Sequence, residues 1–388
     1  MAFAQSRAVA PARRLASSLY SDMPMIGSRP AVLVLTAFAL SACAPAMSRL
    51  QSFTNLRPDP VAELGAHRFP SEWWYFNGHL DSPGGRVDFA STIFQVYVPD
   101  STHYGWLPVA SLVPGPLYFG HVVLLDEATG HYSFAERNAL PSRSGEPRVN
   151  ATAAIGRLDV HLGDWFITRN DQGTFFLHSS TEDGRVLDLS LGEQKPQVSH
   201  GPGWSGTATT GRMYYTSATR LAATGTLGGQ PVTGIAWFDH QWGGDSGDGS
   251  SSSSPNWDWF SLQLDDNRDL MVYRVRDHSG AVADQFVSII GPGGRETSTR
   301  DMTLTSGANF KAPGGAVYPT AWRLRLSDGT DLTILAVTRN QELKPRIPGF
   351  GYFEGAVKVG GTARGVGFME LTGYDPSWNG KGGLLGSF

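Results

Sequence analysis

Short segments in which apolar and polar residues alternate recur along most of the chain, and this pattern limits the possible folds more than any other feature. Examples are residues 87–98, 158–162, 269–275 and 321–326. Alternation with a period of two residues is typical of a β-strand that buries one face. Because no long segment carries an apolar stripe at helical spacing, the sequence predicts an all-β protein.

Turn-forming residues lie between these segments. Pro-Gly-Gly at 83–85, Glu-Asp-Gly at 182–184 and Ser-Asp-Gly at 327–329 are examples. The 47 glycines and 24 prolines amount to about 18 % of the 388 residues, against about 12 % in average usage. Short strands separated by such turns predict antiparallel sandwiches or barrels. A weak sequence similarity, here called the echo, between residues 73–81 and 257–265 suggests two related β domains.

The first 66 residues carry the signals for export. Residues 31–40 form an apolar run that is too short to span a bilayer as a helix, which predicts a signal peptide over residues 1–42. Leu40-Ser41-Ala42-Cys43 resembles a bacterial lipobox, and Cys43 is the only cysteine of the chain. We therefore expect residues 43–66 to be a lipidated tether that anchors the chain to a membrane on the periplasmic side of a bacterial cell envelope. The alternative is an ordinary secretory signal that is cut after the small residues.

Several classes of function are excluded by composition and motifs. The formal net charge of −4 gives no basic surface for nucleic acid. A single cysteine excludes an internal disulfide and a multi-cysteine zinc site, and no paired histidine spacing predicts a metal. Residues 244–247 imitate a serine-protease loop but lie in low-complexity sequence, and the chain has no G-x-S-x-G elbow. We predict neither a metal nor a cofactor.

Three clusters could carry chemistry. In the first, Glu72 precedes the aromatic residues Trp73, Trp74 and Tyr75. On a strand these rings point to both faces, so that one face can pack in a core while the other lines a cavity. Plain hydrophobic packing is the alternative.

In the second cluster, Trp237 and Asp239 share one face of a predicted strand, while Phe238, His240 and Trp242 share the other. A histidine next to an acid among aromatic residues is costly unless both are partnered. A satisfied buried His–Asp pair is the alternative to a functional role.

In the third cluster, Asp258 lies between Trp257 and Trp259. Desolvation by the two indoles would raise the pKa of this carboxyl group and favour its protonated form. A neutral carboxylic acid is what the protonation of an alkene requires, and ring faces stabilise the resulting cation.

Together these motifs resemble the family of AttH-type and carotenoid 1,2-hydratase (hydroxyneurosporene synthase) proteins, also known as lipocalin-like predicted secreted hydrolases. The resemblance spans residues 66–376, nearly all of the chain after the predicted signal peptide. The matching segments are residues 71–75, 119–121, 195–196, 200–201, 213–215, 236–243, 257–260, 352–355 and 367–374.

The resemblance implies two consecutive lipocalin-like domains, which we place at 67–225 and 226–388, with an apolar cavity between or within them. It also implies cofactor-free addition of water to a terminal isoprenoid double bond. In that chemistry an acid protonates the alkene, while histidine and aromatic groups steady the cation. His240 and Trp242 match the His-x-Trp of the hydratase signature, and either Asp239 or Asp258 can be the acid.

The resemblance and the clusters together give the expected substrate-binding residues. These are Glu72, Trp73, Trp74, Tyr75, His121, Tyr214, Tyr215, Trp257 and Trp259. Two functions remain open. The chain is either an enzyme of the hydratase, isomerase or cyclase type acting on a hydrophobic isoprenoid or polyene, or a lipid-anchored carrier that holds an apolar molecule without converting it.

Overall fold

The structure is a computed structural model of the chain. It describes residues 61, 63–98, 103–104, 107–108, 115–139, 149–205, 212–244, 256–277, 279–344 and 351–375. All regular elements within these ranges are β-strands, as the alternating pattern predicts. No helix in the described ranges has the length and apolar character needed to cross a membrane. The predicted signal peptide and Cys43 lie outside the described residues.

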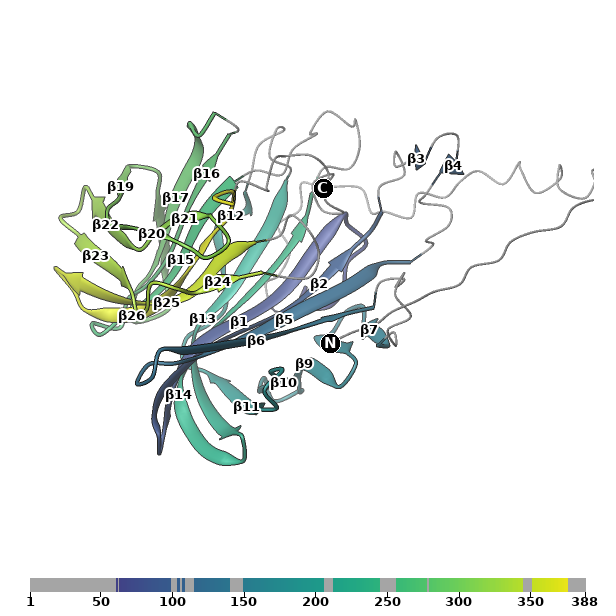
Figure 1. The fold of residues 1–388 in the computed structure, drawn as a ribbon. Helices are drawn as coiled ribbons and strands as arrows, with labels where there is room; N and C mark the ends of the chain where they lie inside the picture. Colours follow the sequence, from purple (N-terminus) through teal and green to yellow (C-terminus); the bar gives the residue numbers. More distant parts are fainter. Residues whose placement is uncertain are drawn as a thin grey trace, which may run out of the picture. The chain divides into compact units, whose positions relative to one another are not determined.

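A 12-stranded antiparallel sheet, here called the N-terminal sheet, holds the first half of the chain (Figure 1). Its strands are β1 (Ser71–Ser82), β2 (Gly85–Val96), β5 (Leu117–Asp126), β6 (His131–Asn138), β7 (Ala151–Ala153), β8 (Asp159–Leu162), β9 (Trp165–Arg169), β10 (Phe175–Ser180), β11 (Val186–Glu193), β12 (Val198–Ser205), β13 (Met213–Leu227) and β14 (Gln230–Gly243). Their order is β6-β5-β2-β1-β14-β13-β11-β10-β9-β8-β7, with β12 paired to β13.

A 10-stranded sheet, here called the C-terminal sheet, holds the second half. Its strands are β15 (Asn256–Leu264), β16 (Asp269–Arg276), β17 (Val282–Ile290), β18 (Glu296–Thr299), β19 (Met302–Ser306), β22 (Ala321–Leu326), β23 (Asp331–Ala336), β24 (Glu342–Leu343), β25 (Tyr352–Gly361) and β26 (Gly365–Leu371). Their order is β18-β17-β16-β15-β26-β25-β23-β22-β19, with β24 paired to β25. Two small hairpins pair β3 (His103–Tyr104) with β4 (Leu107–Pro108), and β20 (Asn309–Lys311) with β21 (Val317–Pro319).

The two sheets repeat one topology. In each, the first strand (β1 or β15) pairs on one side with the strand that follows it and on the other side with the last strand (β14 or β26). The echo between residues 73–81 and 257–265 falls on these two equivalent first strands. Gly234 and Gly365 also occupy equivalent places, because a Cβ atom at either would collide with a backbone carbonyl of the first strand, that of His79 or Gln263. The predicted relation between two β domains is therefore supported by strand order and by register.

The predicted domain boundary at residue 225 does not match the division between the sheets. β13 continues through a two-residue turn into β14, and both strands belong to the N-terminal sheet. Gly228 and Gly229 both have positive φ values, of 56° and 77°, which tight hairpin turns favour. This glycine pair is a hairpin turn and not a linker. The sheets divide after Gly243 and before Asn256.

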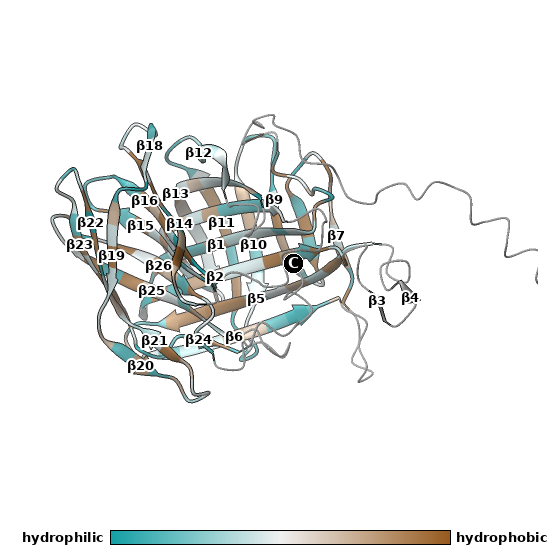
Figure 2. Cartoon of the chain, turned by 90° about the horizontal axis from the view of Figure 1, so that it is seen from above, coloured by the Kyte–Doolittle hydropathy of each residue, from teal (hydrophilic) through white to brown (hydrophobic). Residues whose placement is uncertain are grey.

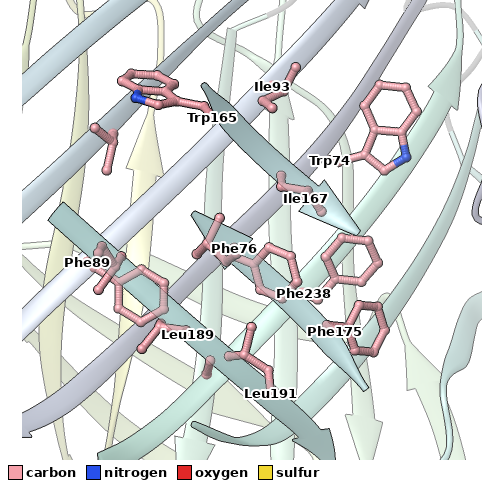
Figure 3. Close-up of a cluster of buried hydrophobic side chains, with 14 of the residues drawn as sticks. Trp74, Phe76, Phe89, Ile93, Trp165, Ile167, Phe175, Leu189, Leu191 and Phe238 are labelled. Atoms are coloured by element: carbon pink, nitrogen blue, oxygen red, sulfur yellow. The ribbon is translucent and has the colours of Figure 1, made fainter. Parts of the chain in front are cut away.

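Each sheet curls around its own apolar core, so that strands far apart in the sheet order, β5 and β8 or β17 and β19, come into contact. Figure 3 shows the core of the N-terminal sheet, where Trp74, Phe76, Phe175 and Phe238 gather. Phe76 lies 4.6 Å from Phe238, centroid to centroid. In Figure 2 apolar and hydrophilic stretches follow one another along the strands, as expected when one face is buried and the other is not.

A buried ion cluster joins the two sheets at one end of their contact. Asp269 of β16 accepts hydrogen bonds from Lys195 Nζ at 2.7 Å, from Thr219 Oγ1 at 2.9 Å and from Arg220 Nη2 at 2.6 Å. Asp269 is fully buried and Lys195 nearly so. A buried cation that loses its anion is left without compensation for its desolvation.

We therefore expect Asp269→Ala to lower the free energy of unfolding by about 3–5 kcal/mol, measured by urea denaturation. The matched control is Asp331→Ala, which removes an exposed ion pair with Arg323 and should change the stability little. Equal effects of the two substitutions would show that Asp269 does not hold the sheets together.

Candidate functional site

The two faces of β1 and β14 have different surroundings. Trp74 and Phe238 point into the core of the N-terminal sheet. Tyr75 and Trp237 belong to a second cluster that contains residues of both sheets, among them Trp259 and Phe368. The predicted division of β14, with Asp239 on the face of Trp237 and His240 on the other, is therefore confirmed. A catalytic set that joins Asp239 to His240 and Trp242 is not formed, because successive residues of a strand face opposite sides.

Polar and aromatic side chains form a row across the N-terminal sheet on the face that meets the C-terminal sheet. In the strand register His121 lies opposite Thr92, Thr92 opposite Tyr75, Tyr75 opposite Asp239, and Asp239 opposite Ser217. All five residues are buried.

A second row crosses the C-terminal sheet. Glu354 lies opposite Glu370, Glu370 opposite Trp259, Trp259 opposite Tyr273, and Tyr273 opposite Phe286. By topology Trp259 is the counterpart of Tyr75, and Glu370 is the counterpart of Asp239.

Hydrogen bonds connect the two rows. Tyr75 Oη donates to Glu354 Oε1 at 2.6 Å. Trp259 Nε1 donates to Tyr215 Oη at 2.9 Å, and Tyr215 Oη donates in turn to Asp239 Oδ2 at 2.8 Å. The rings of Tyr75 and Trp259 meet edge to face at 5.6 Å. These contacts place the acids of both sheets within one aromatic layer, here called the acid layer.

Asp239 is an acid whose charge is poorly tolerated. It is 2 % exposed and accepts hydrogen bonds from Tyr215, Trp237 and Ser217. Burial raises its pKa to about 7, although these hydrogen bonds act in the opposite direction. Near neutral pH a large fraction of this carboxyl group is therefore protonated.

Glu354 and Glu370 form a pair of carboxyl groups on adjacent strands, directly opposite each other. Burial and the charge of Glu370 raise the pKa of Glu354 well above its ordinary value. Burial likewise raises the pKa of Glu370 to about 7, although Trp257 Nε1 donates to its Oε1 at 2.8 Å. Like charges directly opposite each other are unfavourable, so the pair retains at least one proton at neutral pH. Glu354 Oε2 is buried and has no hydrogen-bond partner among the described residues.

Part of the acid layer remains accessible to solvent. Trp73, Phe94, Trp257, Tyr273 and Glu370 are only partly buried, whereas Glu354 is 1 % exposed. These partly exposed side chains are four aromatic rings and one carboxyl group.

Two histidines near the acid layer are neutral. Burial lowers the pKa values of His121 and His200 to about 3. His121 Nε2 is hydrogen-bonded to Tyr352 Oη, and His200 Nε2 lies 2.7 Å from Ser217 Oγ. As neutral imidazoles these groups add no charge to the layer, and each can donate one hydrogen bond and accept another.

Asp258 departs from the predicted role of a neutral proton donor. It is fully buried, but Arg274 Nε and Arg276 Nε approach its Oδ2 at 2.9 and 3.2 Å, and Tyr374 Oη donates to its Oδ1 at 2.7 Å. Two guanidinium groups thus donate charge-assisted hydrogen bonds to the Asp258 carboxyl group. The expected apolar surroundings of Asp258 between two indoles are not found, because the arginines of the neighbouring strand β16 reach its carboxyl group.

The other predicted residues divide between the two faces. Trp73, Tyr75, His121, Tyr215, Trp257 and Trp259 belong to the acid layer or its accessible edge. Glu72, Trp74, Tyr214, His240 and Trp242 lie on the opposite face of the N-terminal sheet, where His240 Nε2 is 2.8 Å from Glu72 Oε1. Tyr214 and Trp242 pack there with Phe69.

Sequence reasoning missed the acid pair. Glu354 and Glu370 stand in segments that carry the family resemblance, but no role was assigned to them. The available signal was that both acids lie among apolar residues of alternating segments, at 352–359 and 365–371. An acid at an otherwise apolar position of a strand indicates a buried carboxyl group.

The fold and the site define a β protein of two lipocalin-like domains with a layer of buried acids where the two sheets meet. The chain belongs to the AttH-like family, whose model matches residues 60–374. The predicted fold class and the predicted family are both confirmed.

Solved structures share this fold. A candidate AttH protein from Nitrosomonas europaea is 28 % identical, with a TM-score of 0.66 over 86 % of this chain and 99 % of its own. Kievitone hydratase from Nectria haematococca is 17 % identical, with a TM-score of 0.61 over 84 % of this chain and 98 % of its own. The second likeness is one of fold alone. No curated protein matches the chain significantly.

The burial of Asp239 makes stability depend on pH in a direction that can be tested. The folded chain keeps this proton up to a pH of about 7, whereas an ordinary aspartate loses it near 3.8. Between these values the folded state binds more protons, so raising the pH lowers the free energy of unfolding. Relative to Asp239→Asn, we expect the wild type to lose stability as the pH rises from 3.8 to about 7, by at most about 1.4 kcal/mol for each pH unit crossed. Urea denaturation at a series of pH values measures the difference, and a difference that stays constant would contradict the assignment.

Proposed function

We propose that the chain catalyses the acid-dependent hydration, or a related conversion, of an apolar unsaturated compound such as an isoprenoid or polyene. The observation that carries this proposal is the Glu354 carboxyl group, whose pKa burial raises well above its ordinary value and whose Oε2 atom has no partner among the described residues. A protonated carboxyl group can give its proton to a carbon atom that comes within reach. The chain shares its fold with a hydratase, and the site supplies the acid that a hydration needs.

The proposed reaction begins with transfer of the Glu354 proton to one alkene carbon. A C–H bond forms with the π electrons, and the other carbon becomes a cation while Glu354 becomes a carboxylate. The rings of Tyr75 and Trp259 lie beside this acid, and ring faces attract cations. A water oxygen then bonds to the cation and releases a proton, which returns to the Glu354–Glu370 pair. Atoms and charge balance without a further reactant.

Asp239 is the other acid of the layer that holds a proton near neutral pH. Both of its oxygen atoms already accept hydrogen bonds, Oδ1 from Trp237 and Ser217 and Oδ2 from Tyr215. Among the described residues, only Tyr75 donates to the Glu354 carboxyl group. We therefore assign proton donation to Glu354 and a positioning role to Asp239, which orients Tyr215 and through it Trp259.

Glu354→Gln tests the acid directly, because glutamine can still bond to Tyr75 but has no acidic proton. Mass spectrometry of lipids that copurify with the chain from its own host would first supply the substrate class. In D2O each turnover should then place one deuterium on carbon. We expect Glu354→Gln to lower kcat by about 10²–10⁴-fold. Wild-type kcat should survive the loss of the Glu370 proton at about pH 7 and fall only at the higher pH that removes the last proton of the Glu354–Glu370 pair, because the charge of Glu370 raises the pKa of Glu354.

The matched control is Asp188→Asn, which alters an exposed acid paired with His178 and should leave kcat unchanged. Unaltered turnover in Glu354→Gln, Glu370→Gln and Asp239→Asn would refute acid catalysis in this layer. Ligand that binds tightly to the wild type and is released without deuterium would instead establish the alternative function, that of a carrier for an apolar molecule.

We also propose that the chain is exported and held on a bacterial membrane by lipid at Cys43, where apolar substrates dissolve. Residues 31–43 support this proposal by their apolar run and lipobox-like end. Two or three acyl chains anchor a protein stably where one does not.

Cys43→Ser removes the only thiol that could be acylated. We expect the variant to lose labelling by an alkyne fatty acid and to leave the membrane fraction, as measured after cell fractionation. Labelling and membrane association equal to those of the wild type would contradict the anchor. The fold should be unaffected, because Cys43 lies outside the segments that form the sheets.

A further inference from the structure

A second cluster of ionisable groups lies on the core face of the N-terminal sheet, away from the acid layer. Glu72 Oε1 is 2.8 Å from His67 Nδ1 and 2.8 Å from His240 Nε2. The three potential ligand atoms lie within 4.8 Å of one another. Glu72 is fully buried, His240 is 1 % exposed and His67 is 9 % exposed.

Neighbouring groups hold these side chains in place. His67 Nε2 is 2.8 Å from Glu63 Oε2. Glu72 Oε2 accepts hydrogen bonds from the backbone N–H of His67 at 2.8 Å and from Gln95 Nε2 at 2.9 Å. A histidine whose second nitrogen meets a carboxylate is the usual arrangement around protein-bound metals.

Aromatic rings fix the two imidazoles from the outside. Trp242 stacks on His67 with centroids 4.1 Å apart, and Trp74 stacks on His240 at 5.3 Å. The rings of the two histidines are 5.7 Å apart. The three ligand atoms are therefore preorganised by packing and by hydrogen bonds, which is the main requirement for a tight metal site.

We propose that His67, Glu72 and His240 bind one divalent transition-metal ion of the zinc class. Two imidazoles and one carboxylate are a donor set that suits Zn²⁺, whereas Mg²⁺ and Ca²⁺ prefer oxygen donors. Zinc bonds of about 2.1 Å in a tetrahedral site separate ligand atoms by about 3.3 Å. The two separations of 2.8 Å from Glu72 Oε1 need to open by about half an ångström once the ion replaces the two shared protons. The third separation, between the two histidine nitrogens, is within 4.8 Å.

Charge also favours a cation at this place. Glu72 is fully buried, and the groups that bond to it are two imidazoles, a backbone N–H and the amide of Gln95. A buried carboxylate needs a positive partner or must give up its charge. A bound ion would supply that partner and, with three protein ligands, keep a position open for water or another small ligand.

Zinc titration of the purified full-length chain, treated first with a chelator, tests the proposal. We expect one Zn²⁺ per chain by calorimetry, with little response to Mg²⁺. Glu72→Gln should weaken binding by at least 100-fold. Glu63→Gln, which leaves all three ligands in place, should weaken it by about tenfold or more because its partner His67 loses orientation.

The control is His178→Ala, which removes an exposed His–Asp pair that could bind zinc adventitiously. Its affinity should equal that of the wild type. Co²⁺ gives a second readout, because an ion beside Trp242 and Trp74 should quench their fluorescence in the wild type but not in Glu72→Gln.

Circular dichroism must show that Glu72→Gln is folded. If it is not, His67→Gln replaces it, since His67 precedes β1 and belongs to no strand. Zinc binding that is weak, that survives in these variants, or that disappears in His178→Ala would overturn the proposal. In the first of these cases an imidazolium ion is the partner of Glu72. Activity of the acid layer is not part of this test, so failure of either proposal can be recognised separately.

Discussion

The hydrogen bond from Tyr75 to Glu354 joins the two sheets in the acid layer, where several carboxyl groups are buried. Each sheet brings carboxyl groups to the contact, and each carboxyl group must find donors there or remain protonated. Asp239 finds three donors. Within the described part of the chain the Glu354 carboxyl group finds one donor, and it faces another acid on the adjacent strand. The hydrogen-bonding capacity of the carboxyl groups in the acid layer is thus only partly used. Glu354, which keeps unused capacity, is the acid that can give up a proton.

The repeated topology explains why the unsatisfied acids occur on one side only. Strand order and register make several residues of the two halves equivalent, namely Tyr75 and Trp259, Asn77 and Ser261, Tyr215 and Tyr352, Asp239 and Glu370, and Ser217 and Glu354. Ser261 Oγ bonds to Asn77 Oδ1 at 3.2 Å, so an equivalent pair meets, as at the axis of an isologous dimer. In one half an acid faces a serine that donates to it. In the other half an acid faces an acid. Burial raises the pKa values of both, and the charge of Glu370 raises that of Glu354 further.

Much of the fold could be predicted from the sequence, because alternation and turn residues are local signals. The domain boundary could not, since the pairing of β13 with β14 around the turn at 228–229, which keeps residue 225 inside one sheet, is known only from the register. Asp239 could be singled out from its aromatic neighbours. The surroundings of Asp258 depend on Arg274 and Arg276, which strand pairing alone brings beside it. The Glu354–Glu370 pair likewise exists only through the register of β25 and β26.

The side-by-side residues Asp239 and His240 show how far sequence adjacency can mislead on a strand. Their side chains point to opposite faces, and the sheet separates them into unlike surroundings. Asp239 faces the other sheet, where burial raises its pKa to about 7 although hydroxyl and indole donors act in the opposite direction. His240 faces a core, where burial lowers its pKa and its hydrogen bond to Glu72 only partly opposes this. One strand therefore serves a proton-holding layer on one face and a His–Glu–His cluster on the other. Because the backbone of β14 is common to both, the two groups share a scaffold but need not share a reaction.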